Sequence, residues 1–295
     1  MDTDISFSPL IIGTMRLGSW GVNMTTNELE RFIDQCVELG LTDFDHADIY
    51  GHYTEEGRFG QVLARRPDLK NKMQLTTKCG IKLITPNRPQ HTVKSYDSTA
   101  QHILTSAEQS LVDLHVEHID LLLIHRPDFL MDAAEIAGAF EQLHKDGKVK
   151  YFGVSNFTTD QFELLHAHIP LVTNQVEASI LHTQAFEDGV IVQCQRHDIR
   201  PTIWSPLGGG KLFSSSDDEN VVRIREVAGP IQEKYNCQLD QLVLAWLMKH
   251  PGGLIPVLGT SKIARIQDAL AATKINITHE EWYALWQASK GEDIA

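Results

Sequence analysis

Eight short apolar runs, separated by longer amphipathic segments, constrain the fold of this chain more than any other feature. The runs are Thr14–Leu17, Thr42–Asp45, Gln74–Lys78, Leu121–His125, Tyr151–Ser155, Asn174–Glu177, Thr202–Ser205 and Ile255–Gly259. The segments between them repeat apolar residues at helical spacing, as at Leu104, Ala107, Leu111 and Leu114. Strands that alternate with helices, without a long polar linker, predict a parallel sheet wrapped by helices.

Eight such repeats in 295 residues favour a closed (β/α)8 TIM barrel, which we expect to be a single domain spanning residues 1–295. An open doubly wound sheet is the alternative. It usually carries G-x-G-x-x-G after its first strand, and "RLGSWGVNM" does not match that spacing. Two long connections, Ile81–Ser98 and Pro206–Asn220, would lie with extra helices on the C-terminal rim as candidate lids.

Charge and cysteine content narrow the class of protein. A net charge of −13 argues against binding nucleic acid or an anionic membrane. The four cysteines are far apart in the sequence, which predicts reduced thiols and a cytoplasmic location. We expect neither a signal peptide nor a membrane span. The sequence gives no clear oligomer signal, and a monomer is the favoured state.

Ionisable side chains stand at or just beyond the ends of three successive runs. Asp45 ends the second run with Tyr50 shortly after it, Lys78 ends the third, and His125 ends the fourth. Because the carboxyl ends of barrel strands meet at one rim, we expect all four side chains in one mouth.

This set has a clear chemical use. A lysine ammonium beside a tyrosine favours the phenolate and lowers a pKa that is ordinarily ~10. Asp45 would hold Lys78, His125 would orient a carbonyl oxygen, and Tyr50 would protonate it. Each residue alone also has a structural interpretation, as a helix cap, a rim aromatic, a solvated charge or a hydrogen-bonded histidine. The combination favours catalysis.

Segments along nearly the whole chain resemble the aldo-keto reductases, bacterial NADPH-dependent members in particular. The matching segments are "DFDHADIYG", "LTTKCG", "DLLLIHRPD", "GKVKYFGVSNF", "NQVEAS", "WSPLGGGKL" and "IPVLGTSK". The resemblance implies a (β/α)8 barrel that reduces aldehydes and ketones with NADPH. It also implies that Asp45, Tyr50, Lys78 and His125 are the catalytic tetrad.

A hydride must come from a cofactor, because no side chain supplies one. The resemblance implies that Ser155, Asn156 and Gln175 hold a nicotinamide carboxamide, and amide side chains suit that group because they both donate and accept hydrogen bonds. Asn156 could instead cap a helix. Trp204 could stack on the nicotinamide ring or be a core tryptophan.

The loop after the seventh run offers backbone N–H groups and one cation for a pyrophosphate, at Ser205, Leu207, Gly208 and Lys211. A Gly-Ser loop without a ligand is the alternative interpretation.

A second anion site is predicted after the eighth run. Thr260, Ser261, Lys262 and Arg265 place hydroxyls and cations at the start of a helix, which suits a 2′-phosphate and favours NADP over NAD. A solvated helix end is the alternative. By its place in the family motif, Asp268 would contact the adenine.

Trp20, Tyr53 and Phe129 follow the first, second and fourth runs and are the predicted substrate pocket. We expect an open site that accepts small carbonyl compounds. No metal site is predicted, since the histidine pairs at 115/118 and 166/168 lack a ligand partner at suitable spacing. The alternative function is an NADP-binding regulatory or interaction protein on the same scaffold.

Overall fold

A closed barrel of eight strands forms the centre of the computed structural model, which describes residues 4–214 and 218–294. The strand order is β1-β10-β9-β8-β7-β6-β3-β2. The strands are β1 (Ile11–Gly13), β2 (Asp43–Asp45), β3 (Gln74–Cys79), β6 (Ile119–Ile124), β7 (Val149–Ser155), β8 (Asn174–Glu177), β9 (Thr202–Trp204) and β10 (Ile255–Leu258). Neighbouring strands pair in parallel, for example β3 with β6 and β8 with β9. The predicted (β/α)8 TIM-barrel fold is confirmed.

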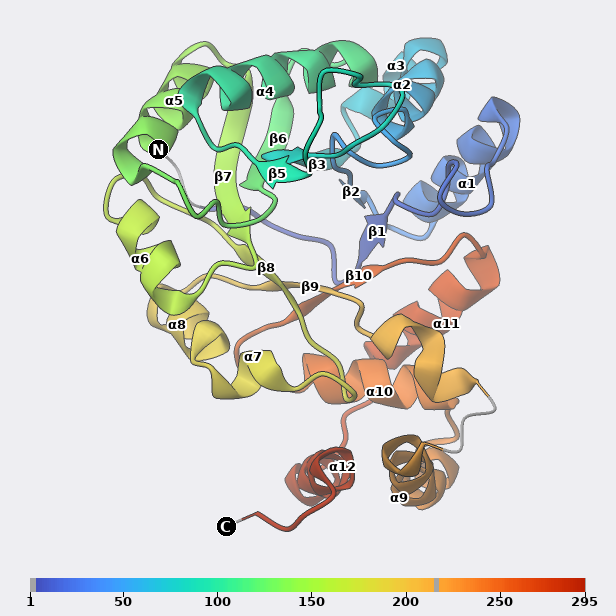
Figure 1. The fold of residues 1–295 in the computed structure, drawn as a ribbon. Coiled ribbons are helices and arrows are strands. Elements are labelled where there is room, and N and C mark those ends of the chain that lie inside the picture. The colour runs from blue at the N-terminus through green and yellow to red at the C-terminus, as the bar shows by residue number, and fades with distance from the viewer. Residues whose placement is uncertain (1–3, 215–217, 295) are drawn as a thin grey trace. The chain divides into compact units, whose positions relative to one another are not determined.

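The chain divides into two compact units, which are described separately, and a single domain remains a prediction. The first unit comprises Met1–Gln175 and Gly259–Ile263. Its helices are α1 (Thr26–Glu38), α2 (Glu55–Arg65), α3 (Pro67–Lys70), α4 (Ala100–Leu114), α5 (Ala133–Lys145) and α6 (Thr159–His166). Helices α4 and α5 lie side by side, and α5 packs against β7 (Figure 1).

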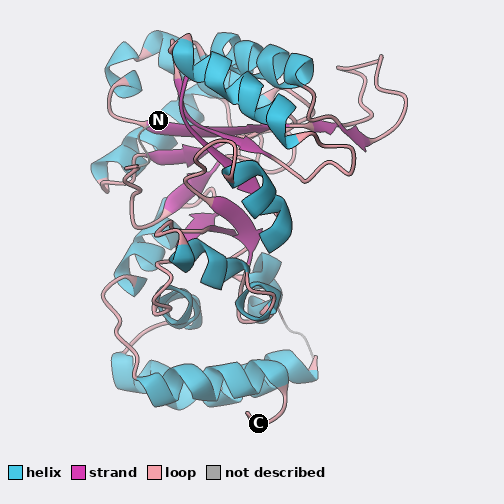
Figure 2. Ribbon diagram, turned by 90° about the vertical axis from the view of Figure 1, so that its left-hand side faces the viewer, coloured by secondary structure: helices cyan, strands magenta, loops and turns pink. Residues whose placement is uncertain are grey.

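The second unit comprises Val176–Leu258 and Ala264–Ala295. Its helices are α7 (Gln184–Glu187), α8 (Val190–Arg196), the 3-10 helix η1 (Gly208–Phe213), α9 (Glu219–Tyr235), α10 (Leu239–Met248), α11 (Ile263–Ala272, beginning at the boundary) and α12 (His279–Lys290). Helices α10 and α12 are tied by Trp246 and Trp282, which stack at 5.2 Å between centroids and exchange hydrogen bonds from each indole N–H to the other's carbonyl. Figure 2 distinguishes the helices, in cyan, from the strands, in magenta.

The helix starts follow the sequence closely. Thr25, Thr158 and Thr278 each form a capping box with the residue three positions on, as the Thr-x-x-Glu/Gln spacing indicates. Each cap satisfies backbone N–H groups that have no partner within the helix, and such a cap contributes about 1 kcal/mol.

The predicted first strand, Thr14–Leu17, is wrong. The strand lies earlier, at Ile11–Gly13, where the residues are fully buried. Thr14 still donates its N–H to the carbonyl of Asp45 at 3.0 Å, but the N–H of Leu17 bonds back to the carbonyl of Thr14 and closes a turn. Phe186, Val190, Ile191 and Cys194 repeat at helical spacing, which predicts one helix, but they fall in two helices because Gly189 (φ +90°) separates α7 from α8.

The first candidate lid contains ordered structure. Within Ile81–Ser98, β4 (Ile81–Lys82) and β5 (Ser95–Tyr96) form an antiparallel pair that was not predicted from the sequence. Asp128 fastens the end of this segment by accepting the N–H and hydroxyl of Ser98. Of the second candidate lid, Pro206–Asn220, residues 215–217 lie outside the described part of the chain.

Among the described residues, no helix is both long and apolar enough to span a membrane.

Candidate active site

The ammonium of Lys78 is the centre of the candidate site. Its Nζ lies 2.6 Å from Oδ2 of Asp45, 2.8 Å from the carbonyl oxygen of His46 and 3.2 Å from the hydroxyl of Tyr50. Lys78 is completely buried and Asp45 almost completely so. A buried ammonium is tolerated only when it is paired and fully hydrogen-bonded, and these three oxygens satisfy its three donors.

The strand register explains why these groups meet. Asp45 is the last residue of β2, and Lys78 lies near the end of β3, which pairs with β2 in parallel. Both side chains are therefore delivered from neighbouring strands at their carboxyl ends. Tyr50 follows β2 through a tight turn in which its N–H bonds to the carbonyl of Ala47. The sequence-predicted grouping of Asp45, Tyr50 and Lys78 is present in the structure.

Burial and charge act on Tyr50 in opposite directions. Burial raises the pKa of the phenol and Asp45 adds to the rise, while the ammonium of Lys78 lowers it. Lys78 acts as expected, but burial outweighs it, so Tyr50 is a protonated phenol at neutral pH. Burial disfavours the charge on Lys78, yet Asp45 and Tyr50 together raise the pKa of its ammonium. The site therefore holds a phenol O–H beside a permanent cation.

His125 stands across the ring of Tyr50. It follows the last residue of β6, and the two ring centroids are 6.0 Å apart in an edge-on arrangement of 79°. Burial, and then the cations of Lys78 and Arg126, hold the pKa of His125 well below its usual range. The imidazole is therefore neutral and can donate one hydrogen bond to a carbonyl oxygen without adding charge.

The turn after Tyr50 is strained. Gly51, His52 and Tyr53 all have positive φ, at +59°, +59° and +65°, although His52 and Tyr53 are not glycines. Surrounding contacts hold this conformation. Tyr53 donates its hydroxyl to the carbonyl of Ile81 at 3.1 Å, and the side-chain amide of Asn87 donates to the carbonyl of His52 at 2.8 Å. Such strain persists only where neighbouring structure enforces it, and it is concentrated at functional sites.

A buried acid that we did not predict from the sequence lies directly behind this turn. Neither carboxylate oxygen of Glu55 has a hydrogen-bond partner among the described residues, and Arg58 Nε lies 3.5 Å from Oε2. Burial raises the pKa of Glu55 to about 7. The sequence signal, "TEEGR" at a helix start, is indistinguishable from ordinary acidic residues in a first helical turn.

The residues expected to hold a carboxamide adjoin the same cluster. Gln175 donates its side-chain amide to Oδ1 of Asp45 at 2.9 Å. Asn156, in a left-handed conformation (φ +60°), donates its amide to the hydroxyl of Ser155, which in turn donates to the carbonyl of Gln175. Asp45 is thus hydrogen-bonded both to Lys78 and to Gln175, one of the residues predicted to bind the nicotinamide carboxamide.

Within the second unit, the predicted ring-stacking and pyrophosphate residues follow β9. Trp204 is half-buried and Ser205 has a positive φ of +52°. Leu207 precedes η1, in which Gly208, Gly209 and Gly210 all have positive φ. The ammonium of Lys211 lies 2.6 Å from Oδ2 of Asp218, so an anion there would compete with a carboxylate. This loop supplies glycine backbone and a cation that is already paired.

The predicted phosphate residues lie between β10 and the first turns of α11. Lys262 donates its backbone N–H to the hydroxyl of Thr260 at 3.2 Å, and Ser261 stands between them. The side chains of Lys262 and Arg265 are exposed, and neither pairs with a carboxylate in the described part of the chain. Asp268 is exposed, and its backbone carbonyl accepts the amide of Gln241.

Two of the three predicted pocket aromatics accompany Tyr50. Trp20 and Tyr53 pack against the apolar cluster that contains Tyr50, and the Trp20 and Tyr50 centroids are 6.2 Å apart. Phe129 is 89% exposed, and its ring centroid lies 6.4 Å from that of Tyr96, which packs against this cluster. Phe129 therefore lies at the outer edge rather than against the phenol.

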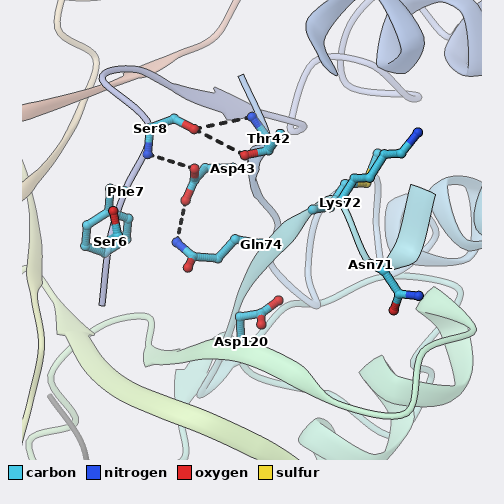
Figure 3. Close-up of a pocket in the computed structure, with 10 residues that line it drawn as sticks. Ser6, Phe7, Ser8, Thr42, Asp43, Asn71, Lys72, Gln74 and Asp120 are labelled. Atoms are coloured by element: carbon cyan, nitrogen blue, oxygen red, sulfur yellow. Dashed lines mark hydrogen bonds between the residues drawn. The ribbon is translucent and has the colours of Figure 1, made fainter. Parts of the chain in front are cut away.

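A hollow of about 380 Å³ lies at the amino ends of β2, β3 and β6, whose carboxyl ends carry the candidate active site. Asp43 begins β2, Gln74 begins β3 and Asp120 lies near the start of β6 (Figure 3). Ser8 donates its backbone N–H to Asp43 at 2.8 Å, and Gln74 donates its amide to the same carboxylate. The hollow is lined mainly by polar residues, several of which are hydrogen-bonded to one another, and none of the predicted site residues is among them.

The family model for the aldo/keto reductase family matches residues 9–290, which is nearly the whole chain. The chain belongs to the aldo/keto reductase family. Members are oxidoreductases that generally use nicotinamide cofactors and act on small-molecule carbonyl compounds, so this aldo-keto reductase is an enzyme of that general kind.

Individual relatives agree with this assignment. The chain is 43% identical to the uncharacterized oxidoreductase YcsN of Bacillus subtilis, over 99% of this chain and 97% of that protein. It is 37% identical to a 6-dehydroglucose reductase of Agrobacterium fabrum, with 99% and 97% covered. A glycerol dehydrogenase structure from Gluconobacter oxydans superposes with a TM-score of 0.84, covering 97% and 92%, at 24% identity, which shows a shared fold only.

Proposed function

We propose that this aldo-keto reductase is an NADPH-dependent enzyme that reduces small aldehydes or ketones to alcohols, with Tyr50 as the proton donor. The observation that carries the proposal is the position of Lys78 Nζ between Asp45 Oδ2 and the Tyr50 hydroxyl, at 2.6 and 3.2 Å. A phenol alone is a weak acid near neutral pH. A fixed ammonium at its oxygen stabilises the phenolate that remains after the proton leaves.

The reduction requires a hydride donor, an acid and a means of orienting the carbonyl group. NADPH, when bound, supplies the hydride that adds to the carbonyl carbon. The neutral His125 imidazole would donate a hydrogen bond to the carbonyl oxygen and direct it toward Tyr50. Tyr50 would donate its proton to that oxygen as negative charge develops, and Lys78 would stabilise the resulting phenolate. Asp45 positions Lys78 and balances its charge.

The side chains present fit a nicotinamide nucleotide. Because Gln175 is hydrogen-bonded to Asp45, the amide group proposed to bind the carboxamide adjoins the tetrad. Ser155 and Asn156 complete that set. Trp204 is proposed to stack on the nicotinamide ring. We assign the pyrophosphate to the loop residues Ser205, Leu207, Gly208 and Lys211.

The exposed cations favour NADP over NAD. Lys262 and Arg265 carry positive charge in a chain whose net charge is −13, and Thr260 and Ser261 add hydroxyls. We assign the 2′-phosphate to these four residues and the adenine to Asp268. We further propose a cytoplasmic location, which four free and buried cysteines support.

A panel assay tests the function. NADPH oxidation is followed with small aldehydes and ketones, including 6-dehydroglucose because a relative is named for reducing it. Turnover of at least one substrate is expected. Tight NADPH binding with no turnover across the panel would instead indicate the binding-only protein.

The cofactor preference is tested in the same assay. Lys262→Ala and Arg265→Ala should each raise the Kd for NADPH about tenfold, because a charged hydrogen bond to phosphate is worth roughly 1.5–3 kcal/mol. The Kd for NADH should change less than twofold. Equal changes for both nucleotides would remove the 2′-phosphate assignment.

A further inference from the structure

A basic segment stands beside the candidate active site of an acidic protein. Within Ile81–Ser98 there are three cations, Lys82, Arg88 and Lys94, and one carboxylate, Asp97, whereas the whole chain has a net charge of −13. Lys82 pairs with Asp97 at 3.3 Å. Arg88 and Lys94 have no carboxylate partner within residues 4–214 and 218–294.

Arg88 is held in a defined place. Its guanidinium carbon lies 4.7 Å from the ring centroid of Tyr53, and its Nη1 donates to the carbonyl of Asn87 at 3.2 Å. Its backbone N–H closes a turn onto Thr85, and the Asn87 side chain is hydrogen-bonded to the carbonyl of His52. A cation that is stacked and fixed at its backbone loses little conformational entropy when it binds an anion.

The position of Arg88 relates it to Tyr50. Tyr53, whose face it covers, is three residues after Tyr50 and packs against the same apolar cluster. The Tyr53 N–H is bonded to the carbonyl of Ile49, and its hydroxyl is bonded to Ile81 and Leu83. The ring of Tyr53 therefore lies between the guanidinium of Arg88 and the apolar cluster that contains Tyr50.

Asp48 interacts electrostatically with Arg88, which lowers the pKa of this carboxyl, but burial has the larger effect and favours its neutral form. Burial raises the pKa of Asp48 well above its ordinary value, and it raises the pKa of Glu55 and of Glu56 to about 7. Burial therefore favours the neutral form of all three carboxyls, and for Glu55 and Glu56 that form predominates below pH 7. Arg126, which follows His125 in the sequence, is a further cation that acts on the imidazole of His125.

We infer that Arg88 is a specificity residue that binds the anionic group of a carbonyl substrate. The inference rests on the function proposed above and deepens it. Aldehydes that carry a carboxylate or a phosphate are the preferred substrates over neutral aldehydes of the same size. The apolar cluster with Trp20 and Tyr53 would contact the remainder of the substrate, and the guanidinium would contact its charged end.

Pairs of substrates that differ mainly in one charged group test the effect of substrate charge separately from that of substrate size. 4-Carboxybenzaldehyde and methyl 4-formylbenzoate have nearly the same shape but differ by one negative charge, and glyceraldehyde 3-phosphate against glyceraldehyde distinguishes phosphate from carboxylate. The steady-state KM and kcat are measured with saturating NADPH for wild type, Arg88→Gln, Arg88→Lys and Lys94→Gln. Lys94→Gln removes the same charge from an exposed position in the same segment.

Arg88→Gln should raise the KM of the anionic partner in at least one pair about tenfold, as expected for loss of a charged hydrogen bond, and leave the neutral partner within twofold. Arg88→Lys should recover part of the loss, and Lys94→Gln should change neither. Equal effects of Arg88→Gln on both partners, or equal effects of Lys94→Gln and Arg88→Gln, would overturn the inference while leaving the reductase function intact. If wild type turned over another aldehyde of the panel but none of these four, the inference would also fail while the reductase function stood; no turnover across the whole panel would overturn the reductase function itself.

Discussion

The two ends of β2 carry buried acids with different hydrogen-bond partners. The partners distinguish an acid that fastens the chain from one proposed to act in catalysis. At the start of β2, Asp43 accepts hydrogen bonds from the backbone of Ser8 and the amide of Gln74 (Figure 3). At the end of β2, Asp45 accepts hydrogen bonds from Lys78 and Gln175. Both carboxylates are buried and both are hydrogen-bonded twice, yet only the second faces a cation.

The partner decides what a buried acid can do. Asp43 accepts hydrogen bonds from neutral donors only, and burial raises its pKa. Its bond from Ser8 fastens the N-terminal segment to β2. Asp45 holds an ammonium whose third hydrogen-bond partner is the hydroxyl of Tyr50. Two acids only two residues apart therefore tie the chain together at one end and position a reactive group at the other.

The largest expected effect comes from Lys78→Met. Loss of the cation should lower kcat/KM about 10³-fold, within the range for general acid catalysis, since the phenolate would have no counter-charge. Buried Asp45 would also lose its counter-charge, which costs roughly 3–5 kcal/mol of stability. The double variant with Asp45→Asn should regain stability without regaining activity. Recovery of activity in the double variant would contradict the assigned role of Lys78.

Asp43→Asn tests the other end of the strand. The amide cannot accept from both Ser8 and Gln74 as the carboxylate does, so the free energy of unfolding should fall by about 1–3 kcal/mol. The kcat/KM should stay within twofold of wild type. Asp45→Asn is the matched control, and it should lower kcat/KM strongly. A loss of activity in Asp43→Asn without a change in stability would contradict the structural role assigned to Asp43.

Glu55→Gln should produce the smallest effect, visible as a change in pH dependence. Because the pKa of Glu55 is raised from 4.5 to about 7 on folding, the folded state binds the proton more tightly than the unfolded state does. Its contribution to stability is therefore complete below about pH 4.5 and is lost as the pH rises through 7. Glutamine cannot ionise, so the variant should gain roughly 2 kcal/mol relative to wild type between pH 5 and 8. Denaturant titrations at a series of pH values measure this, and parallel stability curves would exclude the effect.

The sequence predicts the parts of the molecule that follow local rules. Helix starts at Thr25, Thr158 and Thr278 depend on hydrogen bonds within four residues, and seven of the eight predicted strands overlap observed strands. Parallel barrel geometry then brings the strand-end residues Asp45 and Lys78 together, so their contact also follows from the order of the strands.

Features that depend on contacts distant in sequence were missed. The first strand was predicted a few residues too late in the sequence. Ile11 and its neighbours do not alternate with polar residues, so hydrophobic periodicity does not distinguish the strand from the turn that follows it. The pairing of β4 with β5 joins residues 81–82 and 95–96 across an otherwise polar segment. The positive φ of His52 depends on contacts from Trp20 and Asn87, which no local pattern reveals.

The central claim, that Tyr50 donates the proton, is tested most directly by the kcat of Tyr50→Phe with saturating NADPH and the best substrate of the panel. Tyr50→Phe should lower kcat at least about 100-fold, as expected for removal of a general acid, while the Kd for NADPH stays within twofold of wild type. A kcat within a few fold of wild type would show that Tyr50 is not the proton donor.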